Sequence, residues 1–130
     1  IPQDIVISFK QDPMSHPEEA CLSVTLARSL RDGDYPNANV TLFPTLDGVA
    51  LGDSQVVGSR RFRCTTPFPD EEEVTLEENL EAFLAGNPNN MVICPLCWKE
   101  RYGDAQPDYG VLNPPAVGAL LLNAEKVIDF

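Results

Sequence analysis

The sequence has little positive charge and few of the residues that usually carry metal or acid–base chemistry. Nine Lys and Arg residues stand against 20 Asp and Glu residues, so the net charge is −11 at pH 7, and there is one histidine and one tryptophan. Nucleic acids and anionic membranes attract proteins through basic surface. We therefore expect neither as a partner. No run of about 18 apolar residues occurs, so no membrane insertion is predicted.

Several catalytic motifs are also missing. The sequence contains no glycine-rich phosphate loop and no Gly-x-Ser-x-Gly nucleophile elbow. Its 130 residues suffice for one domain, 1–130, with a single core. The first residue is Ile and not Met, which indicates a processed or trimmed chain and leaves the compartment open.

Short apolar strands alternate with helices along the chain. Residues 4–9 and 39–43 predict buried strands, and the segment that Pro17 opens predicts a helix ending near 32–34. A strand–helix–strand unit of this length implies parallel strands. Further along, the pattern predicts a helix at 74–84, a strand at 91–93, a helix at 114–122 and a strand at 126–130. We therefore predict a three-layer, flavodoxin-like α/β fold, with a mostly parallel sheet covered by helices on both faces.

Residues 45–70 are the least regular part of the sequence. The pattern only weakly indicates a short helix within 49–57, because glycines lie in and around this segment. The acidic run 70–73 is interpreted as the N-terminus of the helix at 74–84, where negative charge is favourable, in preference to a metal site. The chain's only basic cluster precedes it and consists of Arg60, Arg61 and Arg63.

A Cys-x-x-Cys pair follows the strand at 91–93, at the sheet edge where such folds bind ligands. Pro95 suits the first position of a helix, so Cys94 is expected near the N-cap and Cys97 in the first turn. Unpaired backbone N–H groups there favour a thiolate, the species that attacks sulfur electrophiles. The second thiol can resolve a mixed disulfide, or receive or protect a persulfide. The pair predicts a reactive-cysteine site, and Lys99 and Arg101 add positive charge beside it.

Three other interpretations of the pair stay open. A thioredoxin-like oxidoreductase uses this motif early in its fold, whereas only one helix and one strand are expected after Cys97. A zinc site would need further ligands, and Cys21, Cys64 and His16 show no paired spacing. The third is a pair of buried or disulfide-bonded cysteines without chemistry. Cys21 is interpreted as a small core residue of the first helix, and Cys64 is left undecided.

Further candidate pocket residues are expected at the same sheet edge. His16, in the loop after the first strand, is either a general base or a solvated loop residue. Trp98 either walls a pocket or packs in the core. The remaining candidates come from neighbouring loops and from the turn after the cysteine pair, and they are Lys10, Gln11, Asp47, Gly48 and Lys99.

Four stretches of the sequence resemble the DsrE/DsrF-like sulfur-relay proteins. They are His-Pro-Glu-Glu-Ala at 16–20, the stretch 40–49, Val-Ile-Cys-Pro-Leu-Cys at 92–97 and the closing stretch 124–130. The most specific parts are the Cys-Pro-x-Cys segment with its following basic residue and the final Ala-x-x-Val-Ile-x-Phe.

The resemblance implies a small α/β domain that carries sulfur. In the family, the cysteine at the end of this strand accepts sulfane sulfur as a persulfide and passes it on. That cysteine corresponds to Cys94, whereas Cys97 matches a second cysteine found in only some members. The Pro-rich stretch 58–69 departs from the compact members, which leaves pocket shape and partner choice open.

The resemblance also implies the partners. They would be sulfur donor and acceptor proteins or small sulfane compounds, with no organic cofactor, and the chain would form a homotrimer or hexamer. The alternatives are a non-enzymatic binding or assembly module of the same fold with inert cysteines, and a metal-binding Cys-x-x-Cys protein. Whether the protein is an enzyme is not decided by its sequence.

Overall fold

The computed structural model describes residues 3–32, 38–59, 63–71, 73–85 and 87–130. Its central feature is a parallel sheet in the order β2-β1-β7, formed by β1 (Gln3–Phe9), β2 (Ala38–Pro44) and β7 (Lys126–Asp129). A second parallel pair, β5 (Val92–Ile93) and β6 (Val111–Leu112), continues the layer beyond β2 through a bridge between Leu42 and Met91. The predicted mostly parallel sheet is confirmed.

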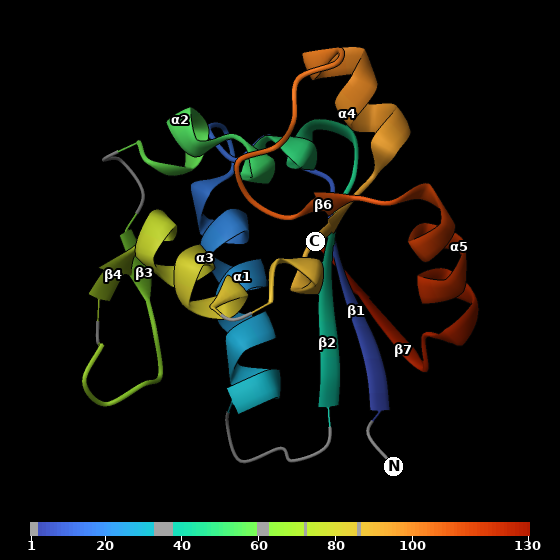
Figure 1. The fold of residues 1–130 in the computed structure, drawn as a ribbon. Helices are drawn as coiled ribbons and strands as arrows, with labels where there is room; N and C mark the ends of the chain where they lie inside the picture. The colour runs from blue at the N-terminus through green and yellow to red at the C-terminus, as the bar shows by residue number, and fades with distance from the viewer. Residues whose placement is uncertain (1–2, 33–37, 60–62, 72, 86) are drawn as a thin grey trace.

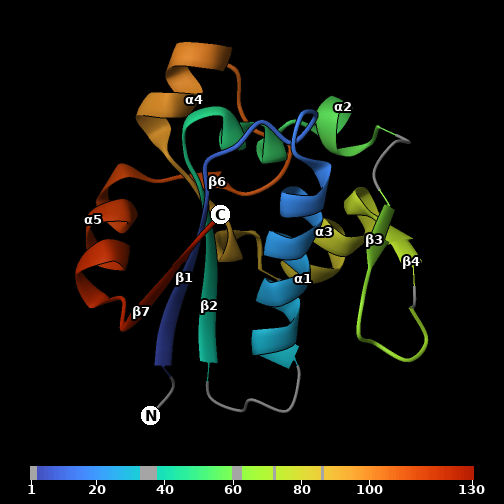
Figure 2. The same ribbon diagram turned by 180° about the vertical axis from the view of Figure 1, so that it is seen from behind.

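Helices cover both faces of this sheet (Figure 1). α1 (Pro17–Asp32) and α3 (Leu76–Leu84) lie on one face, and α5 (Pro114–Asn123) lies on the other. The short helices η1 (Leu46–Gly52), α2 (Ser54–Val57) and α4 (Pro95–Tyr102) gather at the carboxyl ends of the strands, as the reverse view also shows (Figure 2). The remaining short helix, η2 (Pro88–Asn90), precedes β5. The layer order is that of the predicted flavodoxin-like fold.

The main hydrophobic core lies between the sheet and the helices α1 and α3. Alternate residues of β1 point into it, and Ile7 and Phe9 are fully buried there. Leu80 and Phe83 of α3 and Val24 of α1 complete this core. None of the described helices is long and apolar enough to cross a membrane.

The opposite face of the sheet is covered less tightly. Although α5 is rich in apolar residues, none of its residues is buried, and Leu122 is 87% exposed. A cavity separates α5 from the sheet, lined among others by Val6, Thr41 and Leu120. Its lining also includes Asp4 and Asn39, near the amino ends of parallel strands, and Val92 of β5.

The sequence did not predict two of the observed strand pairings. β3 (Arg63–Thr65) and β4 (Glu73–Thr75) form an antiparallel hairpin beside α1, and β6 is only two residues long. The interpretation of the acidic run 70–73 as a helix N-terminus is wrong, because α3 begins at Leu76. A capping box supplies the cap instead, with Thr75 and Glu78 bonding each other's backbone N–H groups. Arg60 and Arg61 of the basic cluster lie outside the described residues.

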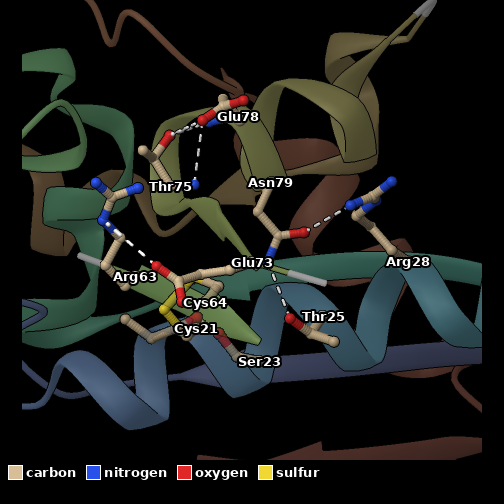
Figure 3. The surroundings of a disulfide bond; sticks show 11 residues. Cys21, Ser23, Thr25, Arg28, Arg63, Cys64, Glu73, Thr75, Glu78 and Asn79 are labelled. Carbon is tan, nitrogen blue, oxygen red and sulfur yellow. Dashed lines mark hydrogen bonds and ion pairs between the residues drawn. A yellow bond between two sulfur atoms is a disulfide. The ribbon is translucent and has the colours of Figure 1, made fainter. Parts of the chain in front are cut away.

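A disulfide fastens the β3–β4 hairpin to α1. It joins Cys21 to Cys64, and both residues are buried (Figure 3). The interpretation of Cys21 as a small core residue is confirmed. The structure adds that its sulfur is bonded to the hairpin, and the disulfide also settles the position of Cys64, which the sequence left undecided.

Polar contacts reinforce this attachment further along α1. Arg28 is buried, and its guanidinium donates to Asn79 Oδ1 at 2.9 Å and to Glu71 Oε2 at 2.9 Å. It also lies over the ring of Phe68, 4.4 Å from the centroid. Asn79 in turn donates to Thr25 Oγ1 at 2.9 Å. Arg28 and Asn79 therefore each bond two polar side chains. The irregular, Pro-rich part of the sequence is thus anchored on α1.

Candidate functional site

The cysteine pair lies at the carboxyl end of β5. The Cys94 N–H donates to the Pro44 carbonyl of β2 at 3.0 Å, which ties the start of α4 to the neighbouring strand end. Cys94 is the N-cap of α4, Pro95 is its first residue, and the Trp98 N–H closes the first turn on the Cys94 carbonyl at 3.0 Å. The predicted placement of Cys94 at the N-cap and of Cys97 in the first turn is confirmed.

Both thiols are free and half-buried. Cys94 and the backbone N–H of Leu46 both lie near enough to the Cys97 thiol to act on its pKa. Burial raises the pKa of Cys97, as do the hydrogen bond to Cys94 and its negative charge, while Leu46 and Arg101 act in the opposite direction. Cys97 is therefore a neutral thiol at pH 7 and presents a proton to the Cys94 sulfur.

Leu46 is in an unusual backbone conformation beside this pair. Its φ is 49°, in the left-handed region that a leucine side chain rarely occupies. Its side chain is 52% exposed, so burial of the leucine does not explain the conformation. The Leu46 N–H lies near Cys97 and favours its thiolate by lowering the pKa of Cys97. Such strain is concentrated at functional sites in proteins.

An ion pair closes one side of the site. Arg101 Nε donates to Asp47 Oδ1 at 3.0 Å, and Arg101 Nη1 donates to the Cys97 carbonyl at 3.1 Å. The guanidinium thus joins η1 to the turn of α4 that holds Cys97. Asp47 was expected at this edge, and its partner Arg101 was expected only as nearby positive charge. The two stand 54 positions apart, so no local spacing pairs them.

Gly48, the neighbour of Asp47, allows η1 to approach the end of β1. A Cβ atom on Gly48 would lie 2.1 Å from the Phe9 carbonyl oxygen. The Thr45 N–H donates to that same oxygen at 2.9 Å, and the Gly48 N–H donates to the Thr45 carbonyl at 2.8 Å. Gly48 therefore holds the loop that carries Leu46 and Asp47 in place.

The other expected pocket residues lie around this edge of the sheet, but not all of them lie beside the two thiols. Lys99 is exposed and lines an open hollow together with Leu96, Cys97 and Glu100. Lys10 is exposed and Gln11 half-buried in the loop after β1. His16 is exposed at the start of α1, where its Nδ1 lies 3.9 Å from Glu19. None of the described hydrogen bonds or ion pairs joins any of these four residues to either cysteine.

Trp98 belongs to the core. It is 2% exposed, its indole N–H donates to the Ala105 carbonyl at 2.7 Å, and its ring stacks on Tyr102 with centroids 4.0 Å apart. Tyr102 also donates to Asp53 Oδ2 at 3.0 Å. Burial, followed by this hydrogen bond, raises the pKa of Tyr102 to about 12, so the phenol stays protonated. These contacts make the far side of α4 a rigid support for the turn with the two thiols.

Within the described part of the chain, no three His, Cys, Asp or Glu side chains are grouped to hold a metal ion. Cys21 and Cys64, two of the residues considered as further zinc ligands, are bonded to each other and have no thiolate to offer. The third, His16, lies with its Nδ1 3.9 Å from Glu19 Oε2 at the start of α1.

Comparison with known proteins gives a likeness of fold. No family model matches the chain, and no curated protein matches it by sequence. Among solved structures, the crystal structure of the ychN protein from E. coli aligns over 100% of both chains, with a TM-score of 0.56 and 18% sequence identity. That protein has a DsrE/DsrF-like fold. The chain shares this fold, which supports the resemblance drawn from its sequence at the level of the architecture.

Proposed function

We propose that this protein carries sulfane sulfur as a persulfide on Cys94 and delivers it to a partner. The observation that carries the proposal is the Cys94 sulfur at the N-cap of α4, with the protonated Cys97 thiol beside it. The positive end of the helix dipole and the neighbouring Cys97 thiol, a hydrogen-bond donor, both stabilise a negative charge on the Cys94 sulfur. A persulfide is a sulfur anion of the same kind, so this environment suits the loaded state as well as the attacking thiolate.

The loading step needs only a donor that contains sulfane sulfur. The Cys94 thiolate attacks the outer sulfur of a donor R–S–S⁻, a new S–S bond forms on Cys94, and the donor leaves as the thiolate R–S⁻. No net oxidation takes place, and transfer to an acceptor thiolate is the same exchange in reverse. The open hollow beside Cys97 admits either a small sulfane compound or the exposed cysteine of a donor protein.

Sulfur loading tests the proposal directly. Protein with Cys94 and Cys97 reduced is incubated with inorganic polysulfide, freed of excess donor and measured at once by intact mass. We expect a gain of one sulfur on Cys97→Ser and none on the matched variant Cys94→Ala, because only the former keeps the attacking thiolate. An unchanged mass of Cys97→Ser, or an equal gain on Cys94→Ala, would contradict the proposal and favour a binding module with inert cysteines.

Self-association is the second part of the proposal, in line with the resemblance. α5 and β7 lie on the same side of the molecule (Figure 1). Their exposed large apolar residues are Leu121, Leu122 and Val127. Among the strands that the structure describes, β7 is the last of its sheet and pairs with β1 alone. Exposed apolar surface together with an unpaired strand edge is characteristic of surfaces that other chains cover. We propose that a second copy of this chain covers this edge.

Replacing Leu122 by glutamate is expected to convert the oligomer into a monomer. The side chain is 87% exposed in the single chain, so the substitution removes packing between copies and leaves the fold unchanged. Light scattering coupled to gel filtration measures the mass. Leu22→Glu on α1, 54% exposed, is the control and is expected to keep the oligomer. A wild-type protein that is monomeric at high concentration would refute this part of the proposal.

A further inference from the structure

We propose that Cys97 discharges the sulfur held on Cys94 as hydrogen sulfide by closing a Cys94–Cys97 disulfide. This activity goes beyond carrying sulfur, because it reduces the sulfane sulfur inside the protein. It rests on the proposed function, since it requires a persulfide on Cys94.

The geometry places the two sulfur atoms for this reaction. Cys94 and Cys97 occupy the N-cap and the first turn of α4, three positions apart, and both thiols are free. The turn is fixed at both residues. The Trp98 N–H holds the Cys94 carbonyl at 3.0 Å, and Arg101 Nη1 holds the Cys97 carbonyl at 3.1 Å. A thiol held this close to a loaded sulfur attacks without the cost of bringing two molecules together.

Atoms and electrons balance within the protein. The Cys97 sulfur attacks Sγ of the Cys94 persulfide, the Sγ–Sγ bond forms, and the bond from Cys94 Sγ to the outer sulfur breaks. The proton that Cys97 releases on forming its thiolate ends on the outer sulfur, which leaves as hydrosulfide, HS⁻. The sulfane sulfur is reduced by two electrons, and the two cysteines are oxidised to a disulfide. No outside oxidant or reductant takes part in this step.

The surroundings of Cys97 set the rate of discharge. Attack requires the Cys97 thiolate, and burial and the neighbouring Cys94 hold the pKa of Cys97 above its usual value. Among the charged groups nearby, Arg101 favours the thiolate, while Asp47 and Glu100 pair with Arg101 and offset its charge. Lys99 lies exposed at the rim of the same hollow. Discharge is therefore slow at pH 7 and quickens by roughly tenfold per pH unit as the pH rises toward the pKa.

The second cysteine pair of the chain cannot do the same chemistry. Cys21 and Cys64 are already bonded to each other, and they are 8% and 0% exposed. The disulfide leaves neither of them a free thiol that could take up sulfur. They serve as an internal reference, because their disulfide is expected to stay intact while the Cys94–Cys97 pair is loaded and discharged.

The experiment compares wild type with Cys97→Ser after loading with inorganic polysulfide and removal of excess donor. Released sulfide, intact mass and thiols open to alkylation are followed over time at several pH values. We expect wild type to lose the added sulfur, to release about one equivalent of sulfide and to lose its alkylatable thiols. Cys97→Ser is expected to keep the added sulfur and to release sulfide more than roughly tenfold more slowly. Unloaded wild type is the control for sulfide release.

The outcomes separate the two proposals. Failure of both proteins to gain sulfur would overturn the proposed function and this inference with it. A gain of sulfur on both, followed by equally slow release from both, would leave the carrier function standing and overturn the discharge step. Rapid release from wild type with Cys94 and Cys97 still alkylatable would also overturn it, because the sulfur would then have left without forming the disulfide.

Discussion

Replacing both Cys21 and Cys64 by alanine is expected to lower the free energy of unfolding by about 4 kcal/mol. The disulfide joins residues 43 positions apart, and a cross-link over that length removes much of the conformational freedom of the unfolded chain. Chemical denaturation without reductant measures the effect as a shift of the unfolding midpoint. Wild type with the disulfide reduced is expected to show a loss of similar size.

Cys97→Ser is the matched control for this measurement. It also removes a cysteine sulfur, but Cys97 is free and half-buried, so its replacement is expected to cost less than about 1 kcal/mol. Equal midpoints for the Cys21→Ala/Cys64→Ala protein and wild type would contradict the prediction. Such a result would mean that Arg28 and its partners hold the hairpin without help from the covalent bond.

The disulfide also marks the limit of prediction from this sequence. The placement of Cys94 is predictable because its determinants are local: an apolar strand ends, and a proline opens a helix. The pairing of Cys21 with Cys64 is not, because it depends on a hairpin whose strands are three residues long and lie in a Pro-rich stretch. Strands this short leave no clear alternation of apolar and polar residues. Cys64 is identified as the partner of Cys21 only by the three-dimensional structure, in which the hairpin packs against α1.

Within the candidate site, the same distinction separates contacts between residues close in the sequence from contacts that depend on the tertiary fold. The Trp98–Tyr102 stack follows helical spacing, one turn apart, whereas the Asp47–Arg101 pair depends on how η1 lies against α4. Nothing in the sequence indicates the left-handed backbone of Leu46, since residue type favours glycine or asparagine there. The contacts that shape the chemistry of Cys97 are therefore largely tertiary.

Replacing Gly48 by alanine is expected to cost about 3 kcal/mol and to disturb the site at the same time. The new Cβ would lie 2.1 Å from the Phe9 carbonyl oxygen and 2.8 Å from its carbon, and both belong to the backbone of β1. A strand in the middle of the sheet cannot give way, so η1 must move off the end of β1. The unfolding midpoint measures the loss of stability.

Gly118→Ala is the control, because a Cβ there meets nothing within 4 Å. Alanine in the middle of a helix is expected to stabilise α5 by about 0.5–1 kcal/mol.

The second readout of Gly48→Ala is chemical. Movement of η1 withdraws the Leu46 N–H and Asp47 from Cys97 and Arg101, so the pH dependence of Cys97 alkylation should shift in Gly48→Ala and stay unchanged in Gly118→Ala. A destabilised Gly48→Ala protein with the wild-type alkylation profile would show that the loop sets the stability of the fold but not the reactivity of the thiol.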